Sequence, residues 1–150
     1  MAVVYLLASG NSSCAVHIDT AQELVDDMPD KIAGVVDRGR ERPLVLLTVP
    51  PDEAERLAIS AETGCEVEIR IVKYSLRELE SFAERALQVG RHIEPGRFHA
   101  TQVDEANNAV LALSDRQPYP ADLREAILDV VPADAMRFQG GVERQDPLAG

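Results

Sequence analysis

The chain has 150 residues, enough for one domain with a sizeable core or for two small lobes. Its hydrophobic content of 45% is ordinary for a globular protein and argues against wholesale disorder. The formal net charge of -11 argues against nucleic-acid binding, which needs a clustered basic surface, and favours basic partners. No apolar run approaches the roughly 20 residues of a membrane span, so no membrane partner is expected.

The first 19 residues are expected to contain a strand or a signal remnant. Residues 2–8 (AVVYLLA) are short and follow no basic residue, so an edge strand is the preferred interpretation. A hairpin with residues 14–18 is one way to pair this strand. Thr20 and Glu23 have capping-box spacing, which predicts a helix that begins there and ends near Met28, just before a proline.

Two strands and a second helix are expected next. Residues 31–37 favour a strand because β-branched side chains cluster there, and a polar turn follows. Residues 44–49 (LVLLTV) form a continuous apolar run, typical of a strand buried on both faces. Asp52 and Glu55 then form an N-terminal helix signal. The apolar face expected for this helix consists of Ala54, Leu57, Ala58 and Ala61.

Residues 66–79 predict a strand that runs directly into a long helix. Val67, Ile69 and Ile71 alternate with polar residues, the period of a half-buried strand. Ser75 and Glu78 have the spacing of a reciprocal helix cap. Tyr74 and Leu79 flank this cap at the positions of a hydrophobic staple. The helix is expected to end at Gly90 and to bury Leu76, Leu79, Phe82, Ala83, Ala86 and Leu87.

The remaining elements repeat the earlier order. Strands are expected at residues 97–103 and 109–113, with a turn between them at 104–108. A helix then follows two prolines and turns Leu123, Ala126, Ile127 and Val130 inward. A last strand covers residues 135–139, with Met136 and Phe138 inward, and residues 140–150 look like a loose tail.

These elements predict an α+β fold of two αββαβ repeats, each a small mixed sheet packed on helices. Ile69 corresponds to Met136 and Ile71 to Phe138, with a separation of 67 residues in each pair. Each helix-to-strand connection predicts a parallel strand pair. The expected segments are 1–19 (N-terminal segment), 20–73 (first lobe), 74–139 (second lobe) and 140–150 (flexible tail).

No catalytic, metal or cofactor site is predicted, so the protein is not expected to be an enzyme. Cys14 and His17 fall on opposite faces of a strand and cannot act together. His92, expected in a loop, and His99, expected in a strand, are interpreted as ordinary surface or hydrogen-bonded histidines. Cys14 and Cys65 are compatible with a disulfide in an exported protein or with two buried thiols. Metal-ligand and phosphate-binding motifs are absent from the sequence.

The remaining property that could support function is an open sheet edge. A sheet built from hairpins leaves at least one edge strand unpaired. A partner can bind there by adding a strand through main-chain hydrogen bonds. This predicts a protein-binding or dimerisation module that uses an open edge strand.

Three stretches carry a family resemblance. IRIVKYSLREL, VDEANNAVLAL and VVPADAMRF, in that order, resemble the pro-regions of bacterial chymotrypsin-like serine proteases of the α-lytic type. AQELVDDMPDKIAGVVD and LVLLTVP look like the preceding segment in actinobacterial members, and ERQDPLAG looks like the junction before the mature protease. The resemblance covers about residues 20–150.

The resemblance implies a non-catalytic function. Such pro-regions are folding catalysts of the attached protease and then inhibit it. In this family the C-terminal lobe pairs its sheet with a protease hairpin, and the tail enters the active-site cleft. The implied partner is a cognate protease, in cis or in trans, and the implied location is extracellular, with a cytoplasmic location otherwise. The implied contact residues are Ala135, Met136, Arg137, Phe138, Gln139, Gly140, Gly141 and Leu148.

Overall fold

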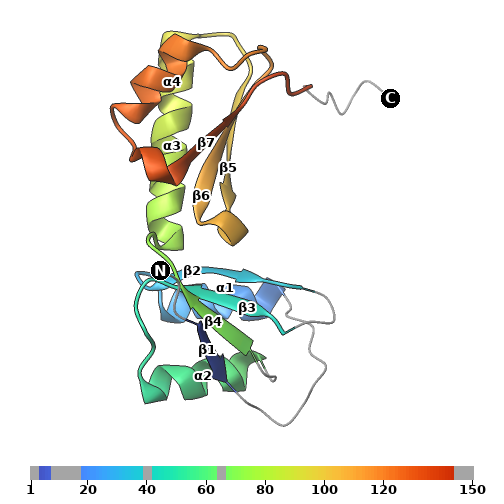
Figure 1. The fold of residues 1–150 in the computed structure, drawn as a ribbon, viewed down its shortest axis with the longest axis vertical. Helices are drawn as coiled ribbons and strands as arrows, with labels where there is room; N and C mark the ends of the chain where they lie inside the picture. The colour runs from blue at the N-terminus through green and yellow to red at the C-terminus, as the bar shows by residue number, and fades with distance from the viewer. Residues whose placement is uncertain (1–3, 8–17, 39–41, 64–66, 144–150) are drawn as a thin grey trace. The chain divides into compact units, whose positions relative to one another are not determined.

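The computed structural model describes residues 4–7, 18–38, 42–63 and 67–143. The chain forms two compact units: Met1–Arg77 with Glu105–Asn108, and Glu78–Asp104 with Ala109–Gly150. The division therefore falls after Arg77, whereas the predicted lobe boundary lies after residue 73. Helix, strand, strand, helix and strand follow one another twice along the chain (Figure 1). The predicted α+β fold with two αββαβ repeats is confirmed.

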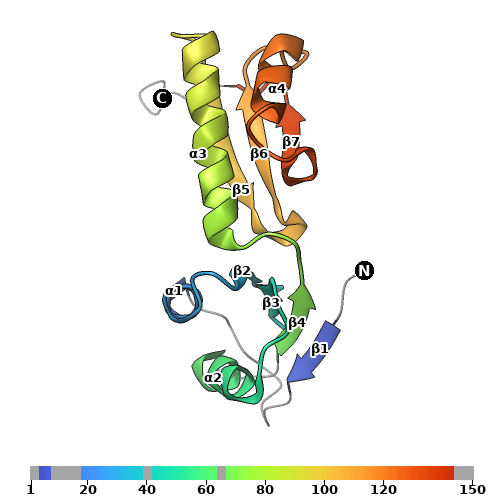
Figure 2. The same cartoon turned by 90° about the vertical axis from the view of Figure 1, so that its left-hand side faces the viewer.

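The first unit contains a four-stranded sheet and two helices. The strand order is β1 (Val4–Leu7), β4 (Val67–Ile71), β3 (Leu44–Leu47) and β2 (Ile32–Val36). The β3–β4 pair is parallel, as predicted, whereas β1 runs antiparallel to β4 and β2 antiparallel to β3. The helices α1 (Ile18–Asp27) and α2 (Glu53–Thr63) lie on one face of this sheet (Figure 2).

The central strand β3 is buried on both faces, as its continuous apolar run predicted. Val45 and Leu47 belong to an apolar cluster with residues of both helices. Leu44 and Leu46 belong to a second cluster with Ala33. Because successive side chains of a strand point to opposite faces, this alternation places apolar contacts on both sides of the sheet.

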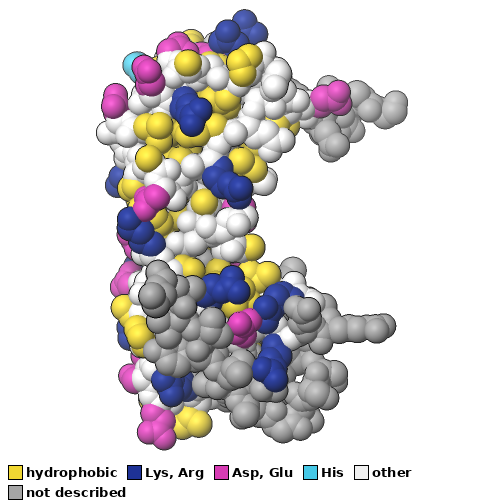
Figure 3. Space-filling view, in the orientation of Figure 1, with side chains coloured by type: hydrophobic (Ala, Val, Ile, Leu, Met, Phe, Trp, Pro, Cys, Tyr) yellow, Lys and Arg dark blue, Asp and Glu magenta, His cyan; other side chains and the backbone are white. Residues whose placement is uncertain are grey.

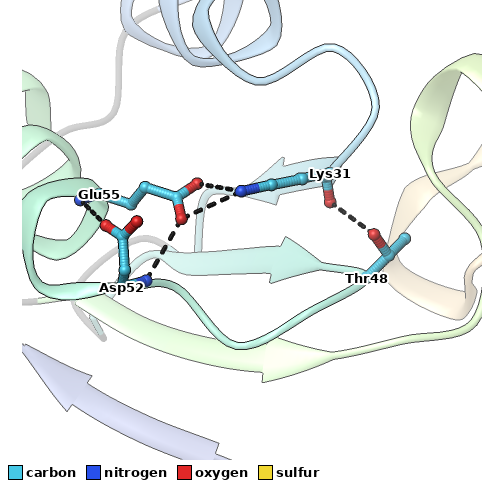
Figure 4. Close-up of polar contacts among 4 residues, drawn as sticks. All are labelled: Lys31, Thr48, Asp52 and Glu55. Atoms are coloured by element: carbon cyan, nitrogen blue, oxygen red, sulfur yellow. Dashed lines mark hydrogen bonds and ion pairs between the residues drawn. The ribbon is translucent and has the colours of Figure 1, made fainter.

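The N-terminus of α2 is held by a reciprocal cap (Figure 4). The Glu55 N–H donates to Asp52 Oδ1 over 2.8 Å, and the Asp52 N–H donates to Glu55 Oε1 over 3.3 Å. Lys31 Nζ donates to both Glu55 carboxylate oxygens at 3.0 and 3.1 Å. Thr48 in turn donates to the Lys31 carbonyl oxygen from its backbone N–H, at 2.8 Å. The predicted helix start is confirmed, and these contacts join it to Lys31 just before β2 and to Thr48 just after β3.

The predicted apolar face of α2 is wrong. Ala54, Leu57 and Ala58 are exposed, and the exposed fraction of the Leu57 side chain is 66%. Among the α2 side chains that the structure describes, Ile59 is fully buried, in the cluster with α1 and the sheet. The side chain of Ala61, the fourth residue of the predicted face, lies outside the described part. The helix carries apolar side chains on more than one side, and packing against α1 selects the side with Ile59.

Two predictions for the N-terminal segment also need correction. β1 pairs with β4, whereas the predicted hairpin would have paired it with residues 14–18. Ile18 is already helical and residues 14–17 lie outside the described residues. The helix thus begins two residues before Thr20, a shift within the usual uncertainty of helix ends.

A turn from the middle of the chain belongs to the first unit. It comprises a 3₁₀ helix, η1 (Glu105–Asn107), and Asn108, which has a positive φ of 50°. The Tyr74 N–H donates to Asn108 Oδ1 at 2.9 Å, and Asn108 Nδ2 donates to the Tyr74 carbonyl at 2.7 Å. The Val35 N–H of β2 donates to Glu105 Oε2 at 3.3 Å. These bonds satisfy backbone groups beside β4 and at the edge of β2.

The second unit contains a three-stranded sheet and two helices. The strand order is β5 (His99–Asp104), β6 (Ala109–Ser114) and β7 (Met136–Gln139). β5 is antiparallel to β6, and β7 is parallel to it, as predicted. The helices α3 (Leu76–Ile93) and α4 (Ala121–Leu128) lie on one face of the sheet, and the short η2 (Ala133–Ala135) precedes β7 (Figures 1 and 2).

The helix α3 buries the stripe that its periodicity predicted, but it does not end at Gly90. Leu79, Phe82 and Ala86 are buried, whereas Leu76, Ala83 and Leu87 of the predicted stripe are partly buried. The helix continues through Gly90 to Ile93. A Cβ atom at Gly90 would lie 2.9 Å from Cγ of His99. This glycine therefore allows a strand side chain to approach the helix closely, and it does not end the helix.

The helix α4 buries Leu123 and Ile127 as predicted, but the expectation for Val130 is wrong. The exposed fraction of the Val130 side chain is 45%, whereas that of Val131 is 3%. The helix ends at Leu128, so the helical period no longer sets the direction of the following side chains. Val131 takes the inward position instead.

Candidate binding edge in the second unit

The strand β7 is an edge of the second sheet. Met136, Arg137, Phe138 and Gln139 lie opposite residues 110–113 of β6 in parallel register. Within the described residues, β7 has no strand on its other side. An unpaired edge presents a row of backbone donors and acceptors to a partner.

The internal repeat indicates which β7 backbone groups face outward. In the equivalent strand β4, the N–H groups of Glu68 and Val72 donate to the Pro43 and Leu47 carbonyls on the β3 side. The backbone groups of Ile69 and Ile71 must face the β1 side, because backbone direction alternates from one residue to the next along a strand. Ile69 and Ile71 correspond to Met136 and Phe138, so we infer that these two residues present their N–H and C=O groups to the open side.

The β4 edge shows how this kind of edge accepts a strand. β1 pairs with β4 in antiparallel register, with Tyr5 opposite Ile69 and Val4 opposite Arg70. β4 and β7 have the same place in the two repeats, each parallel to the central strand of its sheet. The first unit thus already carries an added strand at the position that β7 leaves open.

The side chains of β7 alternate between the two sheet faces. Phe138 lies on the face covered by helices, with its ring centroid 5.0 Å from that of Tyr119 and 5.2 Å from the Arg124 guanidinium. Arg137 is exposed and lies 3.6 Å from Asp104 in a loose ion pair. The strand therefore offers an aromatic side chain on one face and a cation on the other.

The other predicted contact residues differ in accessibility. Met136 is only 8% exposed and Ala135 is fully buried in η2, so these two can reach a partner through their backbone alone. Gln139 and Gly141 are exposed and Gly140 is partly exposed. Leu148 lies outside the described residues.

The segment after β7 is paired with a loop, which differs from the loose tail expected from residue 140 onward. The Gly141 N–H donates to the Arg116 carbonyl, and the Val142 N–H donates to the Ser114 carbonyl, each at 3.0 Å. A Cβ atom at Gly140 would lie 2.3 Å from the Arg116 carbonyl oxygen and 2.7 Å from the Tyr119 nitrogen. Glycine is thus required for this close approach, which continues the pairing beyond β7.

The nearly buried carboxylate of Glu94 supports the same loop. Arg116 Nη1 donates to Glu94 Oε1 at 2.9 Å, and the Glu94 side chain is only 10% exposed. Burial, together with the nearby Glu94 carboxylate, raises the pKa of Tyr119 to about 12. The Ser114 hydroxyl accepts a hydrogen bond from the Arg116 N–H at 3.1 Å. The loop that holds the residues after β7 is therefore anchored to the end of α3.

The histidines have ordinary positions where they are described. His99 Nε2 lies 3.0 Å from the Glu94 carbonyl oxygen, to which it donates. His92 is exposed on α3, although a loop was predicted for it. His17, Cys14 and Cys65 lie outside the described residues. The described residues contain no group of three or more histidine, cysteine, aspartate or glutamate side chains that could hold a metal ion. In the same part of the chain, no helix is long and apolar enough to cross a membrane.

No protein-family model matches this chain, and the curated proteins contain no significant match to it. The β7 edge and the resemblance carried by the sequence are therefore the basis for assigning a function.

Sequence reasoning placed the candidate contact at β7 but missed the loop that supports it. Glu94, Ser114, Arg116 and Tyr119 have no shared spacing or motif. Their contacts join the end of α3 to the connection between β6 and α4. The nearest sequence signal is the glycine pair at positions 140 and 141, which marks a backbone position that needs close approach or a positive φ.

Proposed function

We propose that this chain is a non-catalytic pro-domain that assists the folding of a secreted chymotrypsin-like serine protease and then inhibits it. The observation that carries the proposal is the β7 edge, which pairs with no second strand among the described residues and has the position where the first unit holds β1 on β4. A protease strand would add to β7 in the antiparallel direction. This is the contact that the family resemblance implies for the C-terminal lobe.

The physical basis is strand addition to a preformed edge. A β-barrel protease folds slowly because its pairings are mostly non-local and loop closure precedes their stabilisation. A partner that offers a rigid strand lowers this barrier when it binds the folding transition state more tightly than the unfolded chain. If the same strand remains paired after folding, the partner acts as an inhibitor.

The side chains of β7 define the kind of strand that fits. Residues of the partner on the helix-covered face would lie beside Met136 and Phe138 and should be apolar. Residues on the other face would lie beside Arg137, whose side chain is 58% exposed, and should include a carboxylate. Cross-strand pairs of this kind contribute roughly 0.2–1 kcal/mol each, so main-chain bonds would supply most of the affinity.

The test is N-methylation of the Phe138 amide by semisynthesis. The change removes the inferred outward donor and adds a methyl group at the edge, while every side chain stays the same. N-methylation of Glu143, beyond the paired segment, is the matched control. An α-lytic-type protease is titrated with each protein in the micromolar range, and the recovery of activity on refolding is measured.

We expect the unmodified chain to inhibit the protease and to increase the yield of refolded enzyme. N-methylation at Phe138 should weaken inhibition by roughly 10- to 100-fold, since one hydrogen bond is lost and the neighbouring strand is blocked. The Glu143 control should inhibit like the parent. Absence of both inhibition and refolding by the unmodified chain at micromolar concentration would sink the proposal.

A stand-alone binding or dimerisation module is the second candidate, and the same edge favours it. Two β7 strands can pair with each other in the antiparallel direction. In that case the unmodified chain would dimerise without a protease, and N-methylation of Phe138 would abolish the dimer. Sedimentation of the unmodified chain and of the chain N-methylated at Phe138, each without protease, distinguishes this candidate from the first.

A further inference from the structure

The helix α2 presents an apolar stripe to solvent. Ala54, Leu57 and Ala58 recur at helical spacing and are all exposed. Leu57 has the largest exposed fraction of the large hydrophobic residues in the described chain, at 66%. Ile59 secures the opposite side of the helix in the core. Ala54 and Ala58 also line a groove against α1, next to the core residues Leu24 and Met28. Leu57 does not line that groove, and its side chain is exposed to contact with another molecule.

The second unit contains a groove that matches such a stripe in size and polarity. It lies between α3 and α4 and has a volume of about 750 Å³. Ile93 and Val130, with exposed fractions of 38% and 45%, both line it. On the face of the second unit that Figure 3 shows, hydrophobic side chains lie exposed among basic and acidic ones. The lining residues are Arg85, Gln88, Val89, His92, Ile93, Ala126, Asp129 and Val130.

The charges beside the stripe and the groove are complementary. Glu53 is exposed at the N-terminus of α2, one turn before Leu57. Arg85 and His92 lie two turns apart on α3 along one side of the groove. Arg85 Nη1 is held 3.4 Å from the Val130 carbonyl oxygen, which keeps the cation at the rim. Asp129 lines the opposite side of the groove, next to α4. The acidic end of the stripe can therefore face the α3 side of the groove, away from Asp129.

The equivalent groove of the first unit does not offer this match. It lies between α1 and α2, has a volume of about 400 Å³, and two of its lining residues, Asp27 and Glu55, are acidic. An acidic helix would be repelled there. Of these two grooves, the one between α3 and α4 is larger, and it is lined by Arg85, which could pair with Glu53.

We propose that the groove between α3 and α4 binds the α2 stripe of a second copy of this chain. Leu57 would insert between the two helices, and the small side chains Ala54 and Ala58 would allow close approach, as in other helix-in-groove contacts. Repulsion from the net charge of -11 is screened beyond about 8 Å at physiological salt, so local charge complementarity decides the contact. Each copy presents both surfaces, which makes the contact heterologous.

Three aspartate substitutions test the contact by sedimentation velocity between 5 and 500 µM. Leu57→Asp removes the stripe, and Val130→Asp removes the apolar groove. Val49→Asp is the matched control, because Val49 is 43% exposed and lines neither surface. We expect concentration-dependent association of the parent, at least a tenfold weaker association for the first two variants, and no change for the control.

The decisive measurement mixes the two defective variants. Leu57→Asp retains its groove and Val130→Asp retains its stripe, so one intact contact remains possible between them. We expect equimolar mixing to restore a one-to-one dimer. Circular dichroism checks the fold of each variant, and Ile93→Asp replaces Val130→Asp if that protein does not fold.

Three results overturn the proposal. The parent could remain monomeric at 500 µM. Association could persist in both single variants, which would place the contact elsewhere, for example at β7. Association could also be lost in both variants without recovery on mixing, which would indicate a contact between identical surfaces.

Discussion

Replacement of Gly140 by alanine tests the close approach that holds the segment after β7. The added Cβ atom would lie 2.3 Å from the Arg116 carbonyl oxygen and 2.7 Å from the Tyr119 nitrogen. Both are backbone atoms, so rotation of a side chain cannot relieve the contact. We expect the segment to move away from the loop and lose the hydrogen bonds that Gly141 and Val142 donate.

The magnitude follows from three contributions. Overpacking of this kind costs about 1–3 kcal/mol. The two hydrogen bonds contribute about 0.5–1.5 kcal/mol each. The lower entropy of the unfolded alanine variant offsets about 0.4–1 kcal/mol. The net expected loss is about 1–6 kcal/mol in the free energy of unfolding, with a central value of about 3 kcal/mol.

The assay combines urea unfolding, followed by circular dichroism, with amide hydrogen exchange. Exchange of the Gly141 and Val142 amides should accelerate more than that of β6 amides, because the change acts on the clamped segment first. Gly96→Ala is the control, since Gly96 has a positive φ of 79° but no atom lies within 4 Å of the position that an added Cβ would take. It isolates backbone strain, at about 1–2 kcal/mol, from the steric clash.

This account of Gly140 is refuted if Gly140→Ala loses no more stability than Gly96→Ala. Faster exchange in the control at residues 141 and 142 would equally contradict it, since a side chain at Gly96 would meet no atom of that segment. Under the proposed function, Gly140→Ala should also weaken protease inhibition, because the tail would leave β7 in a different direction.

Two further predictions concern the core and the pH dependence of stability. Ile59→Ala should lower the free energy of unfolding by about 2–5 kcal/mol, while Leu57→Ala should change it by less than about 0.5 kcal/mol, measured by urea unfolding. Equal losses would contradict the observed orientation of α2. The raised pKa of Tyr119, about 12, means that the folded state retains this proton longer than the unfolded state. The free energy of unfolding should therefore fall as the pH rises from 10 to 12. Tyr119→Phe should remove the part of this fall that comes from ionisation of Tyr119. Phenolate absorbance at high pH should show that Glu94→Gln lowers the pKa of Tyr119.

Local sequence patterns predicted most of the elements because they depend on neighbours along the chain. The stripe of α3, the alternation of β4 and the helix start at Asp52 all result from contacts within a few residues. The repeat was visible for the same reason, since the order of elements recurs in both halves. The two parallel strand pairs then followed from the length of the connections.

The errors occur where several arrangements satisfy the local pattern. α2 carries apolar residues on two sides, and periodicity alone favoured Leu57, whereas the structure buries Ile59. Gly90 has the features of a helix end, yet a strand histidine packs against it inside the helix. The apolar segment predicted at residues 2–8 could pair with any exposed edge, and its described part, Val4–Leu7, pairs with β4. Each outcome depends on a neighbour that is distant in sequence.

The candidate site shows the same division. The sequence by itself determined that a strand ends at Gln139, that Met136 and Phe138 share one face, and that a glycine pair follows, although the predicted start at Ala135 falls in η2. Only the tertiary structure decided that β7 is an edge, that its counterpart β4 is covered by β1, and that Gly140 is pressed against the loop at Arg116. An open edge is defined by the strands around it, and these are set by packing between distant segments that local periodicity does not encode.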